Sequence, residues 1–152
     1  MNDSFFEQRE AAMGVLQAGR SEEALSLLNH LIDIAPSAQG RNHEHLADTL
    51  ATVSGIHAKA ARFEEAIAVQ KRARAMFDEA ASDSDAGYVH DILVEIAGIA
   101  CHAGYWGDAE AALLRALEIA KRVNDERCNP EMATARIEHV KSRQLLPTVW
   151  DF

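Results

Sequence analysis

Three short stretches of the chain resemble one another and are almost evenly spaced. Each begins with a glycine or alanine, which suits a tight turn, and has an apolar helical pattern on either side. The alanines that close the stretches, Ala24, Ala66 and Ala109, lie 42 and 43 residues apart. A fixed period of this length is typical of helical hairpins that stack beside one another, so the sequence predicts an all-α solenoid. The three stretches are Gly19–Ala24, Ala61–Ala66 and Gly104–Ala109.

The apolar periodicity predicts seven helices. Strand-like alternation is scarce and alanine is abundant, and both features favour helix over sheet. The three prolines, Pro36, Pro130 and Pro147, stand at expected helix boundaries. We expect Ser21 to cap the second helix and Asn129 to cap the last one, with Pro130 at its first position. The predicted helices span 3–18, 21–35, 43–60, 63–81, 86–103, 106–123 and 130–145.

The predicted elements form one domain over residues 1–145. Its repeats are 3–36, 43–81 and 86–123, and a capping helix over 130–145 follows them. The connections at 37–42 and 82–87 are polar and of ordinary length, and no long linker divides the chain. Residues 146–152 form an apolar tail with three possible fates: folding back on the last helix, docking on another copy as a homodimer, or disorder.

The composition restricts the partners and the compartment. A formal net charge of −9 and a pI of about 5.2 repel phosphate backbones and anionic lipid, so we expect no nucleic acid partner. No apolar run approaches the ~20 residues of a membrane span, and the N-terminus does not resemble a signal peptide. Two cysteines provide no disulfide framework. We therefore expect a soluble, reduced, cytoplasmic protein.

The sequence offers no constellation for catalysis or for a cofactor. Seven histidines occur, but no two have the helical spacing that would present two metal ligands on one face. We interpret them as surface or boundary residues. The paired acids Glu22-Glu23 and Glu64-Glu65 stand at equivalent helix starts, where they stabilise the helix dipole. We expect no catalytic residues, no cofactor and no metal, and hence a protein that is not an enzyme.

Small and large residues follow the same order in each unit. Within the first helix the eighth position is small, the turn has glycine or alanine, and an aromatic residue follows in two of the units. This pattern resembles the tetratricopeptide repeat, and the run Ala109–Ile119 with the longer period is similar to the kinesin-light-chain-like subclass of about 42 residues. The eighth positions are Ala12, Ser54 and Ala97, and the aromatic residues are Phe63 and Trp106.

The resemblance covers about residues 5–140 and implies a right-handed α-solenoid of three hairpins with a C-terminal capping helix. Such a fold binds a peptide or a partner helix in its concave groove. If the first helix of each unit packs one face inward, the opposite positions face the groove. These are Phe6, Arg9, Met13, Leu16 and Gln17 in the first unit, Asp48, Ala51, Gly55, Ala58 and Lys59 in the second, and Asp91, Val94, Gly98, Cys101 and His102 in the third.

The leading hypothesis is a non-catalytic interaction scaffold or adaptor with a protein or peptide partner. Asp48 and Asp91 would repel the carboxylate-ended chaperone tails that some family members bind. Gly55 and Gly98 stand at matching positions, where they serve either close helix packing or an open pocket in the groove floor. The alternatives are a structural module that self-associates and a regulatory tetratricopeptide module of a signalling system.

Overall fold

The computed structural model describes residues 2–34, 41–123, 125–126 and 128–143. These residues form seven helices and no strand, which confirms the predicted all-α helical repeat. The tail over 146–152 and its three predicted fates lie outside the described residues. The helices are α1 (Asn2–Gln17), α2 (Ser21–Ile34), α3 (Arg41–Lys59), α4 (Phe63–Arg74), α5 (Asp83–Ala103), α6 (Trp106–Arg122) and α7 (Pro130–Lys141).

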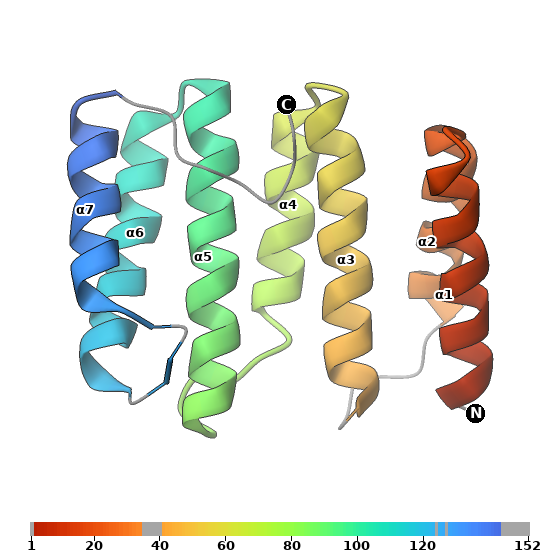
Figure 1. Cartoon of the computed structure of the whole chain (residues 1–152), viewed down its shortest axis with the longest axis horizontal. Helices are drawn as coiled ribbons and strands as arrows, with labels where there is room; N and C mark the ends of the chain where they lie inside the picture. Colours follow the sequence, from red (N-terminus) through yellow and green to blue (C-terminus); the bar gives the residue numbers. More distant parts are fainter. Residues whose placement is uncertain (1, 35–40, 124, 127, 144–152) are drawn as a thin grey trace.

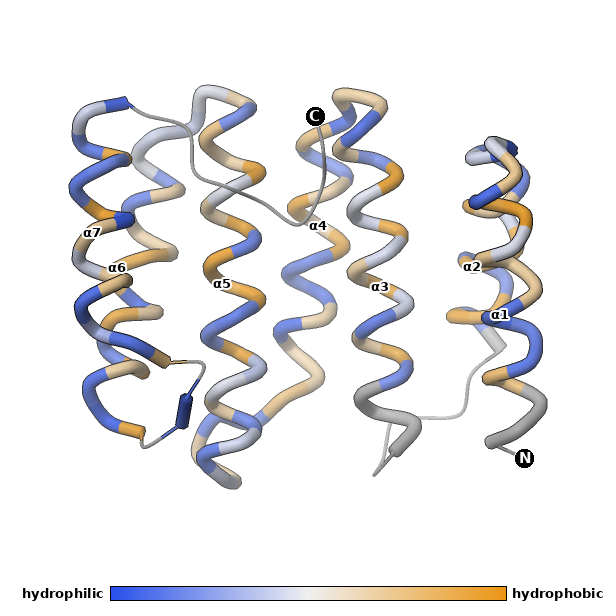
Figure 2. Tube along the Cα trace, viewed as in Figure 1, coloured by the Kyte–Doolittle hydropathy of each residue, from blue (hydrophilic) through white to orange (hydrophobic). Residues whose placement is uncertain are grey.

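The helices stand side by side in two rows. In Figure 1, α1, α3, α5 and α7 form the front row, while α2, α4 and α6 lie behind them. A short turn joins α1 to α2, α3 to α4, and α5 to α6, so three hairpins stack along the molecule. Figure 2 shows hydrophobic and hydrophilic residues interspersed along each helix. Helix α5 is the most enclosed of the described helices, since residues 96–101 are all buried.

The three hairpin turns share one backbone geometry. Gly19, Ala61 and Gly104 have φ values of 84°, 61° and 81°, in the left-handed region. In each turn the amide of this residue donates to the carbonyl three residues earlier. The amide of the next residue donates to the carbonyl five residues before it, for example from Tyr105 to Ala100 at 2.8 Å. This pattern closes the first helix and turns the chain into the second. It explains why glycine stands at two of these positions, whereas Ala61 adopts the same conformation with a side chain.

The helix starts differ in part from the sequence prediction. Ser21 is not a cap, because it is already the first residue of α2 and the carbonyl of Arg20 accepts the first helical hydrogen bond. Asn129 is confirmed as the cap of α7, since its Oδ1 accepts from the amides of the second and third residues that follow it. Ser82 caps α5 by accepting from the Asp85 amide at 3.0 Å, so α5 begins three residues before the predicted start.

Helix α4 ends at Arg74, seven residues before the predicted end. The amides of Met76 and Phe77 bond three residues back rather than four, which tightens the chain into a turn. The Asp78 side chain then accepts from the amide of Ala80 at 3.0 Å and holds the turn that follows. The early end places Phe77 in the core, where it is only 3% exposed.

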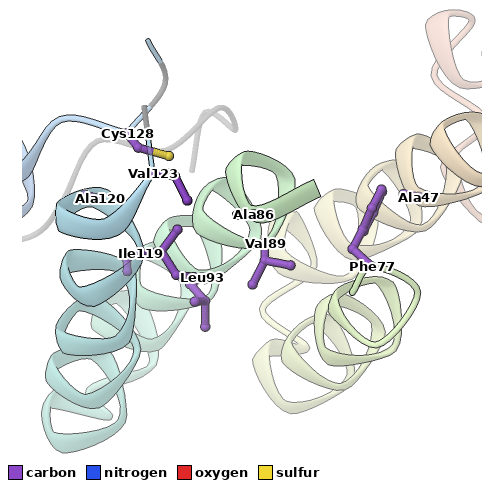
Figure 3. Close-up of a cluster of buried hydrophobic side chains, with 10 residues drawn as sticks. Ala47, Phe77, Ala86, Val89, Leu93, Ile119, Ala120, Val123 and Cys128 are labelled. Atoms are coloured by element: carbon purple, nitrogen blue, oxygen red, sulfur yellow. The ribbon is translucent and has the colours of Figure 1, made fainter. Parts of the chain in front are cut away.

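Buried apolar side chains connect neighbouring hairpins along the whole stack. One cluster joins the first two hairpins through Leu28, Leu50 and Val53. Figure 3 shows the next cluster, in which Phe77 and Val89 lie between the second and third hairpins. A further cluster joins Ile137 and Val140 of α7 to Leu113 of α6 and to Ala97 and Cys101 of α5. Each hairpin therefore depends on its neighbour to bury its apolar face.

Candidate binding surface

The residues that the sequence assigns to the groove differ in exposure. Many of them lie on the helices of the front row, with their side chains exposed or half-buried. Exposed members are Phe6, Gln17, Asp48 and Lys59; half-buried members are Arg9, Met13, Leu16, Ala51, Asp91, Val94 and His102; buried members are Gly55, Ala58, Gly98 and Cys101.

Two of the buried members are corrected to core residues. Ala58 is 1% exposed and packs with Ala66 and Ile99, while Cys101 is 2% exposed and belongs to the cluster that includes Leu113. Each stands four residues after the small eighth-position residue of its unit, Ser54 or Ala97, and near the end of the first helix of its hairpin. There the helix faces the core rather than the groove, so neither side chain is available to a partner.

Four of the predicted groove residues line one cavity of about 460 Å³. Asp48 and Ala51 come from α3, and Asp91 and Val94 come from α5. The cavity thus lies where the front helices of the second and third hairpins stand next to each other (Figure 1). The remaining lining residues are Ala47, Gln70, Phe77, Tyr88, His90, Ile92, Glu95 and Arg136.

An aromatic pair forms part of the cavity lining. The rings of Phe77 and Tyr88 stack with centroids 5.0 Å apart and an angle of 21° between their planes. Phe77 reaches this position because α4 ends at Arg74, as described above. The cavity therefore combines a flat, apolar surface with the polar side chains of α3 and α5.

Two buried polar residues, Gln70 of α4 and His90 of α5, also line the cavity. Each is 1% exposed. The Nδ1 of His90 lies 3.0 Å from Oδ1 of Asp91. Among the residues that the structure describes, neither Oε1 of Gln70 nor Nε2 of His90 has a hydrogen-bond partner. Buried polar atoms without a partner cost stability, and they often mark a functional site.

Neither of these two residues is predicted from the sequence as part of the site. His90 is expected there to be a surface or boundary histidine, but it is buried at the front of the third hairpin. Gln70 stands between Ala66 and Ala73 on the buried face of α4. The signal available in the sequence is a polar residue within the apolar stripe of α4. Whether this residue lines a cavity depends on α3 and α5, which pack against α4.

The ionisable groups around the cavity are mostly acidic. Three carboxylates line it, from Asp48, Asp91 and Glu95, against the single guanidinium of Arg136. The Asp91 side chain is 46% exposed, so its charge faces the cavity mouth as well as His90. The local potential therefore favours a positively charged group over a negatively charged one.

The part of the chain that the structure describes offers neither a metal site nor a membrane-spanning helix. No three histidine, cysteine or acidic side chains there come together in a way that would hold a metal ion. Within the same residues, every helix is too short or too polar to span a bilayer.

The stacked hairpins define a helical repeat protein whose front row carries the candidate surface. Residues 8–79 match the family model for the tetratricopeptide repeat. This match covers just under half of the chain and, together with the stacked helical hairpins, supports a protein of the tetratricopeptide repeat superfamily. Repeats of this superfamily generally mediate protein–protein interactions and are typically non-catalytic. No curated protein has a sequence that matches this chain. The likeness to the kinesin-light-chain-like subclass rests on the sequence resemblance.

Proposed function

We propose that this protein is a non-catalytic adaptor that binds a segment of a partner protein against α3 and α5. One observation carries the proposal: four residues that the repeat pattern assigns to the groove line a single cavity of about 460 Å³. That volume is within the usual range for ligand pockets. We expect the cavity to hold one or two side chains of the partner, while the rest of the segment lies along the front row.

The composition of the cavity supports a binding role rather than catalysis. His90 and Asp91 form a hydrogen-bonded pair, which resembles part of a catalytic triad. The described lining residues, however, include no serine, threonine or cysteine to act as the nucleophile of such a triad. Cys101 and Cys128 are both buried in the core, and no disulfide joins them, which fits the reducing conditions of the cytoplasm.

The proposal is tested by filling the cavity. Ala51 is half-buried in the cavity wall, so Ala51→Trp is expected to occlude it. Ala68→Trp is the matched control, because Ala68 is exposed on α4 and does not line this cavity. Tagged full-length proteins would capture partners from the source cell, followed by quantitative mass spectrometry. A partner that binds the wild type and the control but not Ala51→Trp supports the adaptor function.

The rival hypothesis of self-association predicts a different result. Light scattering would then give a mass that rises with protein concentration, and Ala51→Trp would leave captured proteins unchanged. A concentration-independent monomer that loses a defined partner on Ala51→Trp contradicts self-association. The regulatory alternative is a form of the adaptor function and is distinguished by the identity of the captured partner.

A further inference from the structure

Two polar side chains that line the cavity between α3 and α5 carry buried hydrogen-bond acceptors without a donor among the described residues. A carboxylate can only accept, so Nδ1 of His90 carries the proton that it shares with Asp91. In the neutral ring, Nε2 is then a bare acceptor. Oε1 of Gln70 is an acceptor as well, and neither atom is satisfied by any residue that the structure describes. An occupant of this cavity is therefore expected to supply donors.

The charges around the cavity indicate what kind of donor fits. Asp48, Asp91 and Glu95 add carboxylate acceptors to the two neutral ones, and they outnumber the single Arg136. A carboxylate ligand would meet both the wrong charge and the wrong hydrogen-bonding partners. An apolar side chain would displace water and leave the acceptors of Gln70 and His90 unsatisfied. Both classes of occupant are disfavoured.

The aromatic pair adds a requirement of shape. The half-buried ring of Tyr88, stacked on the buried ring of Phe77, provides an aromatic surface in the same cavity lining as these acceptors. A guanidinium group is planar, stacks on aromatic rings, and carries five N–H donors and no acceptor. An ammonium group has three donors, is more strongly hydrated and lacks a flat face. The guanidinium group matches the cavity in charge, donor count and shape.

We propose that this cavity is a pocket for an arginine side chain of the partner segment. The inference rests on the proposed adaptor function and adds the chemistry that the partner must present. In the bound state, the guanidinium donates to the acceptors of Gln70 and His90 and to the carboxylates near the cavity mouth, and its plane lies against the aromatic pair.

The pocket is tested by titrating the full-length protein with capped pentapeptides at about pH 8, above the ordinary histidine pKa of about 6.5. The probes are acetyl-Gly-Gly-Xaa-Gly-Gly-amide, in which Xaa is arginine, citrulline or norleucine. Nitrogen-15 NMR of the histidine rings follows Nε2 of His90, whose signal is assigned with a His90→Gln variant. We expect the arginine peptide to bind with a Kd on the order of 1 mM and to shift this signal. The two neutral peptides should bind about tenfold more weakly.

Two variants and one control separate recognition from folding. Gln70→Leu removes an unsatisfied acceptor at similar volume, so it should keep or raise the melting temperature while weakening arginine binding about threefold to tenfold. Asp91→Asn removes a partly exposed charge and should weaken binding about tenfold. Asp33→Asn, at an exposed position of α2 outside the cavity, should leave binding unchanged.

Several outcomes would overturn the pocket. These are norleucine binding as tightly as arginine, no binding of the arginine peptide at about 20 mM, well above the expected Kd, and equal losses in Asp33→Asn and Asp91→Asn. The titration uses no partner protein, so it fails independently of the adaptor function. If Ala51→Trp abolishes partner capture but the arginine peptide does not bind, the binding surface stands and the arginine pocket is rejected.

Discussion

The phenolic hydroxyl of Tyr105 donates a hydrogen bond to Oε1 of Glu64 at 3.1 Å, across the junction between the second and third hairpins. One hairpin earlier, Arg62 donates to Oε1 of Glu22, also at 3.1 Å. Tyr105 and Arg62 both stand immediately before the second helix of their hairpin, and each acid lies in the first turn of the previous second helix. Equivalent positions thus tie successive hairpins together with different chemistry.

From the hydrogen bond of Tyr105 we expect the stability of the protein to depend on pH in the alkaline range. The hydrogen bond to Glu64, followed by the charge of that carboxylate, raises the pKa of Tyr105 above its ordinary value. A raised folded-state pKa adds stability that is present below the unfolded pKa of about 10 and is lost as the pH rises through the folded value. Urea midpoints of wild type and Tyr105→Phe should therefore differ at neutral pH and converge above about pH 10. A constant difference across this range would contradict the link.

From the surroundings of His57 we expect the opposite pH dependence of stability, a loss at acidic pH. Burial, and then the nearby Arg62, lower the pKa of His57, whose Nδ1 accepts from Nε of Arg62 at 3.0 Å. This contribution to stability is present above the ordinary histidine pKa of about 6.5 and is lost as the pH falls through the lower folded value. His57→Asn keeps an acceptor but cannot be protonated. Between about pH 7.5 and 5.5 its melting temperature should fall less than that of the wild type.

The hairpin turns predict a stabilising substitution. Ala61 has φ of 61°, where a side chain is strained, whereas the matching turns have glycine. Ala61→Gly should raise the free energy of unfolding by roughly 0.5–1 kcal/mol. Gly104→Ala is the reciprocal control: a Cβ there meets no atom within 4 Å, so only the backbone conformation opposes it. It should lose about 1 kcal/mol. Denaturant unfolding that gives the same sign for both variants would contradict this account.

We expect the ion pairs of Glu79 to stabilise the junction between the second and third hairpins. Its carboxylate, 16% exposed, contacts the guanidinium groups of Arg74, Arg115 and Arg122. Glu79→Gln should lower the free energy of unfolding by about 1–2 kcal/mol, because three like charges lose their common partner. Glu118→Gln is the control, since Glu118 also pairs with Arg115 but is 68% exposed. Its cost should stay below about 0.5 kcal/mol, and equal costs would argue against the cluster.

Gly98 is buried in α5, and this favours the packing alternative for the matching glycines. Gly98→Leu should then overpack the structure and destabilise it by roughly 1–3 kcal/mol, as measured by thermal unfolding. Gly14→Leu is the comparison, because Gly14 is exposed on α1 and a Cβ added there would meet no atom within 4 Å, so it should be neutral or stabilising. A stable Gly98→Leu protein that no longer captures its partner would instead support the open-pocket alternative.

The sequence predicts the features that are set by the backbone conformation of a few neighbouring residues. The turns at Gly19, Ala61 and Gly104 can be recognised because a left-handed residue is needed wherever a hairpin closes. The end of α4 cannot be placed in this way, because it depends on the burial of Phe77 against other hairpins. The burial of His90 is hidden for the same reason, since only the packed neighbours decide whether a polar residue is exposed or buried.

The early end of α4 at Arg74 has a consequence for how the candidate site changes between related chains. Phe77 belongs both to the core and to the cavity wall because the helix stops and the chain turns there. Had the helix continued to residue 81, as its apolar pattern suggests, the stacked pair of Phe77 and Tyr88 would be lost from the cavity lining. Every residue of the front row, including Tyr88, would nevertheless be the same. Inserting or deleting a residue at this junction is therefore expected to change the shape of the cavity without replacing any of the front-row side chains that line it.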